Sequence, residues 1–176
     1  MKIFLDFEAS SLSDRGYPVE VAWVFQDGRS ETHLIKPAPG WTDWDHAAEA
    51  VHGLSREKLG EEGELHDLVA ARMIEALSDH DLFASAPSWE GKWLSVLLRG
   101  AGLPRHALRL RDTDQALIAT AMEILRPVVP SARLDVEVHG LVSSAKAGKV
   151  AQPAHRALPD APVSYTHLTL PTNREV

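Results

Sequence analysis

The stretch that decides the fold is IFLDFEAS at residues 3–10. Its apolar residues indicate a buried strand close to the N-terminus. Side chains two residues apart lie on the same face of a strand, so Asp6 and Glu8 would present two carboxylates together beside a hydrophobic core. Two like charges held close raise each other's pKa unless a cation joins them, and carboxylate oxygens suit Mg²⁺ or Mn²⁺. The stretch therefore predicts either a metal site or two solvated acids at a strand end.

The first 36 residues predict an antiparallel meander of three strands. Residues 1–7, 19–25 and 30–36 have the apolar or alternating pattern of strands. Asp27-Gly28 is a strong hairpin signal between the second and third of them.

Beyond the meander, helices alternate with short strands. Apolar residues at helical spacing, including Leu65 and Leu68, predict an amphipathic helix over 64–78. The candidate N-caps of the other helices are Asp43 or Asp45, Ser55, Ser88, and Asp112 or Thr113. Further strands are expected at 81–86 and 108–110, and further helices at 114–125 and 132–145. This order predicts an α/β fold in which a mixed sheet, the meander plus parallel strands, is flanked by helices.

The composition is that of an ordinary globular protein. With 176 residues, 44% of them hydrophobic and 24% charged, one domain with a sizeable core is expected. The chain has no cysteine, which excludes disulfides and thiolate sites and is compatible with a reducing cytoplasm. No apolar run is long enough to span a bilayer, so no membrane partner is expected. The net charge of −7 argues against a generic nucleic-acid binder, but less against an enzyme whose bound metal supplies positive charge.

Four segments carry candidate chemistry: DFE at residues 6–8, VHGLS at 51–55, SAPSWEGKWL at 85–94 and HRALPDA at 155–161. Together they resemble the DEDD superfamily of 3′–5′ exonucleases. The similarity is to its histidine-containing branch, which includes the proofreading subunit of replicative DNA polymerase, ribonuclease T and oligoribonuclease. The resemblance covers about residues 1–161 and implies a ribonuclease H-like fold. It also implies metal-dependent hydrolysis of phosphodiester bonds at the 3′ end of single-stranded nucleic acid.

Cleavage of a phosphodiester needs stabilised charge on the attacking and leaving oxygens, which two divalent metal ions about 4 Å apart provide. The candidate ligands of two Mg²⁺ or Mn²⁺ ions are Asp6, Glu8, Glu90 and Asp160. His155 is the candidate general base, because imidazole titrates near neutral pH, and Asp6 and Glu8 complete the predicted catalytic set.

The resemblance also implies substrate-binding positions. Leu12 matches the apolar residue of the family that packs against the terminal base. Ser11 stands where the family usually has Gly and where the backbone meets the 3′ end. Trp89 and Trp93 lie four residues apart and favour core packing over stacking on a base. We interpret His52 as a turn histidine with structural hydrogen bonds and leave it out of the site.

The departures from the family pattern keep other interpretations open. The position of Glu90 is normally Asp, and catalytic geometry is sensitive to shifts of about 1 Å. The alternative function is a catalytically weakened nucleic-acid-binding or regulatory domain on the same fold. A third interpretation is an unrelated α/β protein with coincidental motifs. The choice between DNA and RNA and the oligomeric state, a homodimer included, stay open.

The chain is expected to form one exonuclease-like domain over residues 1–161, with its last helix cut at about Ala161. Residues 162–176, PVSYTHLTLPTNREV, are Thr-rich and continue no apolar face. They also resemble translated adaptor sequence, so we interpret them as a non-native or disordered tail.

Overall fold

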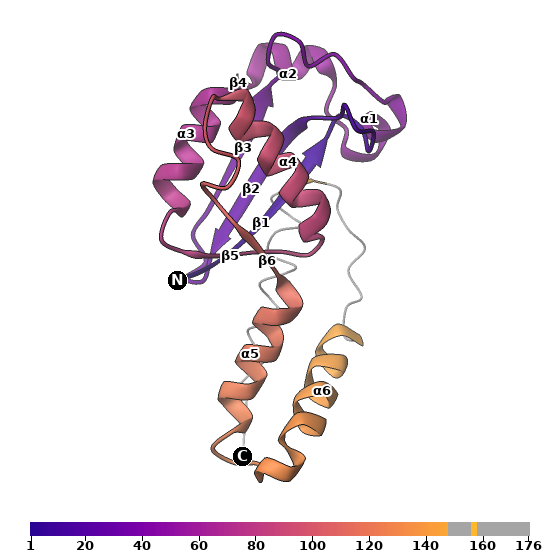
Figure 1. Ribbon diagram of the computed structural model, residues 1–176. Coiled ribbons are helices and arrows are strands. Elements are labelled where there is room, and N and C mark those ends of the chain that lie inside the picture. Colours follow the sequence, from indigo (N-terminus) through magenta and orange to yellow (C-terminus); the bar gives the residue numbers. More distant parts are fainter. Residues whose placement is uncertain (148–155, 158–176) are drawn as a thin grey trace.

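A computed structural model describes residues 1–147 and 156–157 of the chain, and Figure 1 shows its architecture. The centre is a six-stranded sheet in the order β4-β3-β2-β1-β5-β6. β1 pairs antiparallel with β2, and β2 with β3, whereas the other pairs are parallel. The predicted mixed α/β sheet is therefore confirmed. The strands are β1 (Lys2–Ala9), β2 (Pro18–Phe25), β3 (Ser30–Lys36), β4 (Glu64–Leu65), β5 (Asp81–Ala84) and β6 (Leu110–Asp112).

Six helices accompany this sheet in the described part of the chain. In Figure 1, α3 and α4 cover one face of the sheet, while α5 and α6 form a pair that extends away from it. None of these helices is long and apolar enough to cross a membrane. Their bounds are α1 (His46–His52), α2 (Arg56–Glu62), α3 (His66–Leu77), α4 (Pro87–Gly100), α5 (Thr113–Leu125) and α6 (Ser131–Ala147).

Three of the predicted N-caps are confirmed. The side chains of Asp45, Ser55 and Asp112 accept hydrogen bonds from backbone N–H groups in the first turns of α1, α2 and α5. Ser88 does not cap α4, because the helix begins at Pro87 and already includes Ser88. Proline suits the first turn, since its fixed φ fits a helix and it has no N–H that needs a partner there.

The helix expected over 64–78 begins at His66, because Glu64–Leu65 pairs with Ile35 and Lys36 as the short strand β4. Leu65 and Leu68 are exposed, although both were predicted to lie in the apolar stripe. Leu65 belongs to the extended segment before the helix, and the helix turns Leu68 away from the sheet.

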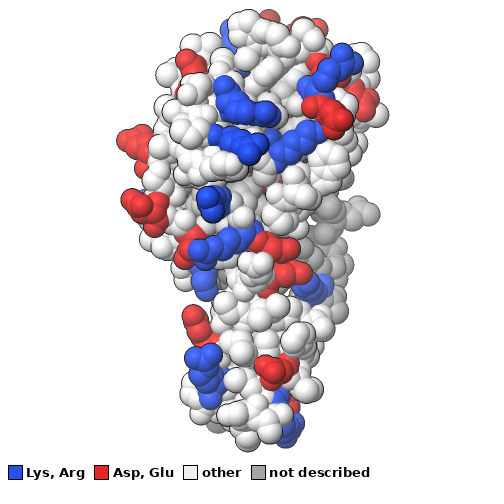
Figure 2. Space-filling model, in the orientation of Figure 1, with Lys and Arg blue, Asp and Glu red and all other residues white. Residues whose placement is uncertain are grey.

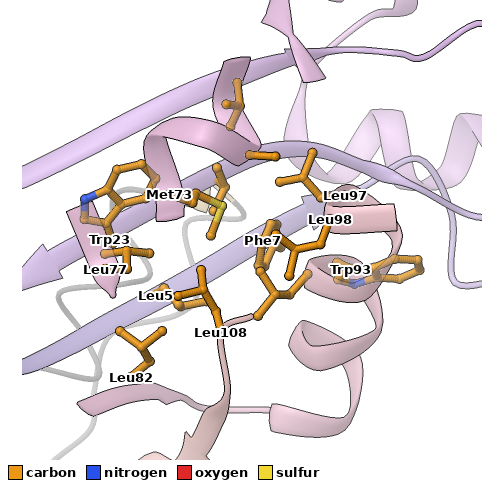
Figure 3. Packing of buried hydrophobic residues seen from close by; sticks show 14 of the residues in the cluster. Leu5, Phe7, Trp23, Met73, Leu77, Leu82, Trp93, Leu97, Leu98 and Leu108 are labelled. Carbon is orange, nitrogen blue, oxygen red and sulfur yellow. The ribbon is translucent and has the colours of Figure 1, made fainter. Parts of the chain in front are cut away.

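The main core lies between the sheet and the two helices α3 and α4, as Figure 3 shows. Ile3, Leu5 and Phe7 of β1 point into it. Phe4 lies on the opposite face, where its ring stacks on Phe83 at a centroid distance of 5.6 Å. By the alternation of a strand, Asp6 shares the face of Phe4. The central strand is thus apolar on both faces up to the point where its acids begin.

Candidate active site

The two acids of β1 lie close to the carboxyl end of that strand. Asp6 is opposite Ala22 and Glu8 is opposite Glu20 of β2, and the register shifts between Glu8 and Ala9. β5 runs parallel to β1 and ends at Ala84, from where the chain enters α4 at Pro87. Ligand sites of α/β sheets form at the carboxyl ends of parallel strands. The topology therefore brings the start of α4 to the end of β1 that carries the acids.

Glu90 connects α4 to β1. It lies in the first turn of the helix, its residue is only 6% exposed, and its Oε2 accepts a hydrogen bond of 3.1 Å from the backbone N–H of Phe7. Burial, with the negative charge of Glu8 adding to it, raises the pKa of Glu90 to about 8, although hydrogen bonds from Phe7 and Asp6 act in the opposite direction. The structure thus brings together three of the four predicted metal ligands, Asp6, Glu8 and Glu90.

The chemistry of these donors suits a divalent cation. A cation beside a buried carboxylate and its two acidic neighbours would stabilise their ionised forms, and hard oxygen ligands bind Mg²⁺ or Mn²⁺. Within residues 1–147 and 156–157, however, no group of three or more His, Asp or Glu side chains is arranged to hold a metal ion. Asp160, the fourth predicted ligand, and His155, the predicted base, lie outside the described residues. The described donors therefore fit the metal in type without forming a complete set.

Two residues of the C-terminal motif, Arg156 and Ala157, are described, and both contact Glu20. The Arg156 guanidinium donates from Nη2 to Oε1 at 2.6 Å and from Nε to Oε2 at 3.0 Å. The backbone N–H of Ala157 donates to Oε2 at 2.8 Å. Since Glu20 is opposite Glu8 in the sheet, the motif is attached beside the acids of β1.

A cavity of about 490 Å³ opens beside the acids. Glu8 and Glu90 line it, together with both predicted substrate-binding residues, Leu12 and Ser11. The side chain of Leu12 is free to contact a ligand, because the residue is 69% exposed. Ser11 is buried, and its hydroxyl donates to Asp43. The Ser11 side chain therefore holds the loop, whereas Leu12 faces the cavity.

Trp89 and Trp93 differ in their surroundings. Their rings stack at a centroid distance of 6.0 Å, and Nζ of Lys92 lies over both. Trp93 belongs to the core at 2% exposure, as predicted, whereas Trp89 is 42% exposed, and both residues line the cavity. The four-residue spacing predicted a shared helix face, but not that the first turn of α4 extends beyond the core.

His52 and Glu20 complete the surroundings of the acids. Nδ1 of His52 accepts a hydrogen bond of 3.1 Å from the backbone N–H of Leu54, so the predicted structural hydrogen bond is present. His52 is the last residue of α1 and also lines the cavity. Burial lowers the pKa of His52. Glu20 was missed by the sequence reasoning. The signal for it was one acid inside the strand PVEVAWVF, all of whose residues are buried.

The sequence matches no protein-family model and no curated protein. Solved structures of exonuclease I are similar to it in fold. The complex of Escherichia coli exonuclease I with a dT13 oligonucleotide has a TM-score of 0.64 at 17% identity over 94% of this chain. The zinc-bound complex of the same enzyme with single-stranded DNA has a TM-score of 0.65 at 16% identity over 94%. The moderately thermophilic exonuclease I of Methylocaldum szegediense has a TM-score of 0.66 at 16% identity over 95%.

The fold is ribonuclease H-like. At such low identity the likeness establishes this architecture alone. The chain spans 39%, 38% and 39% of the three exonuclease I chains, so most of each of those proteins has no counterpart here.

Proposed function

We propose that this chain is a metal-dependent 3′–5′ exonuclease of the DEDD superfamily, histidine-containing branch, acting on single-stranded nucleic acid. The observation that carries the proposal is the placement of buried Glu90 against the β1 backbone between Asp6 and Glu8. The carboxyl groups of Glu8 and Glu90 line a cavity large enough for a nucleotide, and Asp6 interacts with Glu90. The similar structures include exonuclease I bound to single-stranded DNA and to zinc.

Asp6, Glu8, Glu90 and Asp160 would hold two divalent ions, Mg²⁺ or Mn²⁺. When bound, these ions supply the positive charge that offsets the charge developing on the attacking and leaving oxygens. His155 takes the proton of the attacking water. Glu90 is one methylene longer than the Asp usual in the family, and its hydrogen bond to Phe7 N–H fixes the longer side chain against β1.

The cavity supplies contacts for the terminal nucleotide. The exposed side chains of Leu12 and Trp89 offer apolar and aromatic surface to a base. Binding of the phosphates needs positively charged side chains, although the chain as a whole has a net charge of −7. In the view of Figure 2, several Lys and Arg side chains nevertheless lie close together over the region where α4 runs in Figure 1.

We assign the whole of residues 1–161 to this exonuclease domain and residues 162–176 to a tail outside it.

The second candidate function is a nucleic-acid-binding or regulatory domain with a weakened metal site. The observation that favours it is the incomplete ligand set of the described residues. A pKa of about 8 also keeps the Glu90 carboxyl protonated at neutral pH unless a cation binds.

The test uses a single-stranded oligonucleotide labelled at either end, with and without Mn²⁺. We expect stepwise shortening from the 3′ end that needs Mn²⁺, disappears in Asp6→Asn and persists in Asp135→Asn on α6. Binding of the oligonucleotide without any cleavage would support the second candidate. Neither binding nor cleavage would contradict both.

A further inference from the structure

Glu20 is a buried acid to which the exonuclease proposal gives no role. It is the third residue of β2 and is 1% exposed. Its carboxylate accepts hydrogen bonds from the Arg156 guanidinium and from the Ala157 backbone N–H. An ionised carboxylate is strongly disfavoured inside a protein unless it is paired and hydrogen-bonded. The burial of Glu20 therefore favours the chain arrangement in which residues 156–157 lie against β2.

The attachment lies next to the proposed site. Glu20 is opposite Glu8 in the antiparallel register. The Arg156 side chain is also within electrostatic reach of Glu8, since Glu20 first and Glu8 after it raise the pKa of the guanidinium. The backbone bond at Ala157 fixes the main chain as well as the side chain, and Ala157 is fully buried.

Sequence adjacency gives this attachment a consequence. His155 directly precedes Arg156, and Asp160 follows it four residues later. Both residues lie outside the described part of the chain. We propose that Glu20 is a positioning residue of the exonuclease reaction, which acts by holding residues 156–157 of the C-terminal motif against β2 beside Glu8. This inference rests on the function proposed above.

A second carboxylate–arginine pair, less buried than the first, lies at a different place in the fold. Glu31 of β3 accepts from Arg72 of α3, with Nη2–Oε1 at 2.6 Å and Nε–Oε2 at 2.9 Å. This pair has the same fork geometry as Glu20 and Arg156 but joins a strand and a helix away from the cavity. Glu31→Gln is therefore the control for the loss of a carboxylate–arginine pair as such.

The experiment compares Glu20→Gln with Glu31→Gln in the full chain. The readouts are the kcat and KM for a labelled single-stranded oligonucleotide, and Mn²⁺ affinity measured by electron paramagnetic resonance of the free ion. Misplacement by about 1 Å costs about 100-fold in rate, and loss of a group that orients a ligand costs about 10- to 100-fold in metal affinity or activity. We expect Glu20→Gln to lose kcat and Mn²⁺ affinity to that extent with KM nearly unchanged, and Glu31→Gln to keep all three values.

Two further variants separate positioning from folding. Arg156→Lys keeps the positive charge but loses the forked pair of hydrogen bonds, so we expect a loss of kcat and Mn²⁺ affinity smaller than that in Glu20→Gln. If Glu20→Gln does not keep the wild-type circular dichroism spectrum, Arg156→Lys takes its place in the comparison. In the double variant Glu20→Gln/Arg156→Gln, we expect a kcat no lower than in Glu20→Gln alone, because both changes remove the same attachment. Wild-type kcat and Mn²⁺ affinity in folded Glu20→Gln would overturn the inference and leave the proposed function standing. A wild-type chain that neither cleaves nor binds Mn²⁺ would overturn the proposed function and the positioning role with it.

Discussion

Oε2 of Glu90 and the backbone N–H of Phe7 are joined by a hydrogen bond of 3.1 Å. This bond ties the first turn of α4 to the backbone between Asp6 and Glu8, and both of its partners are buried. Glu90 therefore accepts a hydrogen bond from the strand backbone and is also a proposed metal ligand. Substitutions can separate the structural effect of this residue from its proposed effect on metal binding.

Glu90→Gln keeps an oxygen acceptor for the Phe7 N–H but removes the negative charge. We expect the chain to stay folded and the Mn²⁺-dependent exonuclease rate to fall by about 100-fold or more, as for a misplaced catalytic group. Glu90→Ala loses the acceptor too and should lower the free energy of unfolding by a further amount of about 1–3 kcal/mol, because a buried N–H is left unpaired. Urea unfolding and oligonucleotide cleavage measure the two effects. Glu123→Gln on α5 should change neither, and equal rates in Glu90→Gln and wild type would rule out Glu90 as a ligand.

The stability of the metal-free chain should depend on pH through Glu90. The pKa of this carboxyl is about 8 in the folded state, against the ordinary glutamate value of 4.5 that applies to the unfolded chain. Between these values the folded state binds more protons, so the free energy of unfolding decreases as pH rises from about 5 to 8, by an amount of the order of a few kcal/mol. Thermal melts across this range in EDTA measure the slope. We expect Mn²⁺ to reduce it and Glu90→Gln to remove it; an unchanged slope in Glu90→Gln would assign the effect to other groups.

Gly16 allows a close approach of two backbone segments beside the cavity. A Cβ at this position would collide with the Ser11 carbonyl oxygen and lie 3.1 Å from the Trp93 ring. Gly16→Ala should therefore displace the loop that carries Leu12, destabilise the chain by about 1–3 kcal/mol and raise the KM for the oligonucleotide. Gly60→Ala is the control, because nothing lies within 4 Å of its Cβ in α2 and alanine favours a helix. A KM unchanged in Gly16→Ala would argue against a substrate role for this loop.

The two stacked tryptophans should respond differently to truncation. Trp89→Ala should weaken binding of a single-stranded oligonucleotide by about 1–3 kcal/mol, the usual value of a base stacked on an aromatic ring, with little change in stability. Trp93→Ala should instead destabilise the fold by about 3–5 kcal/mol, because a large core side chain is lost. Fluorescence anisotropy of a labelled oligonucleotide and chemical unfolding distinguish the two outcomes. Unchanged affinity in Trp89→Ala would leave the exposed ring without a ligand role.

The parts of the fold that depend on neighbouring residues were predictable. The Asp27-Gly28 hairpin and the caps at Asp45, Ser55 and Asp112 follow from local chemistry, and the structure contains all of them. β4 was not predictable in this way, because Glu64 becomes a strand residue only through its pairing with Ile35, far away in the sequence.

The candidate site shows the same division. Strand alternation suggested Asp6 and Glu8, and a family resemblance suggested Glu90, which the structure places beside them. The bond between Ser11 and Asp43 and the exposure of Trp89 depend on how loops and a helix end pack, which no local pattern contains. The proposed roles of His155 and Asp160 stay predictions.

The hydrogen bonds between Glu20 and Arg156 join positions 136 residues apart. Such a contact closes a long loop, and contacts of high sequence separation form late in folding because loop-closure entropy must first be overcome. We expect the sheet to be complete before this contact forms. A nascent chain on the ribosome would then have a folded sheet before residues 156–157 emerge, so the proposed site could be assembled only after that point of synthesis.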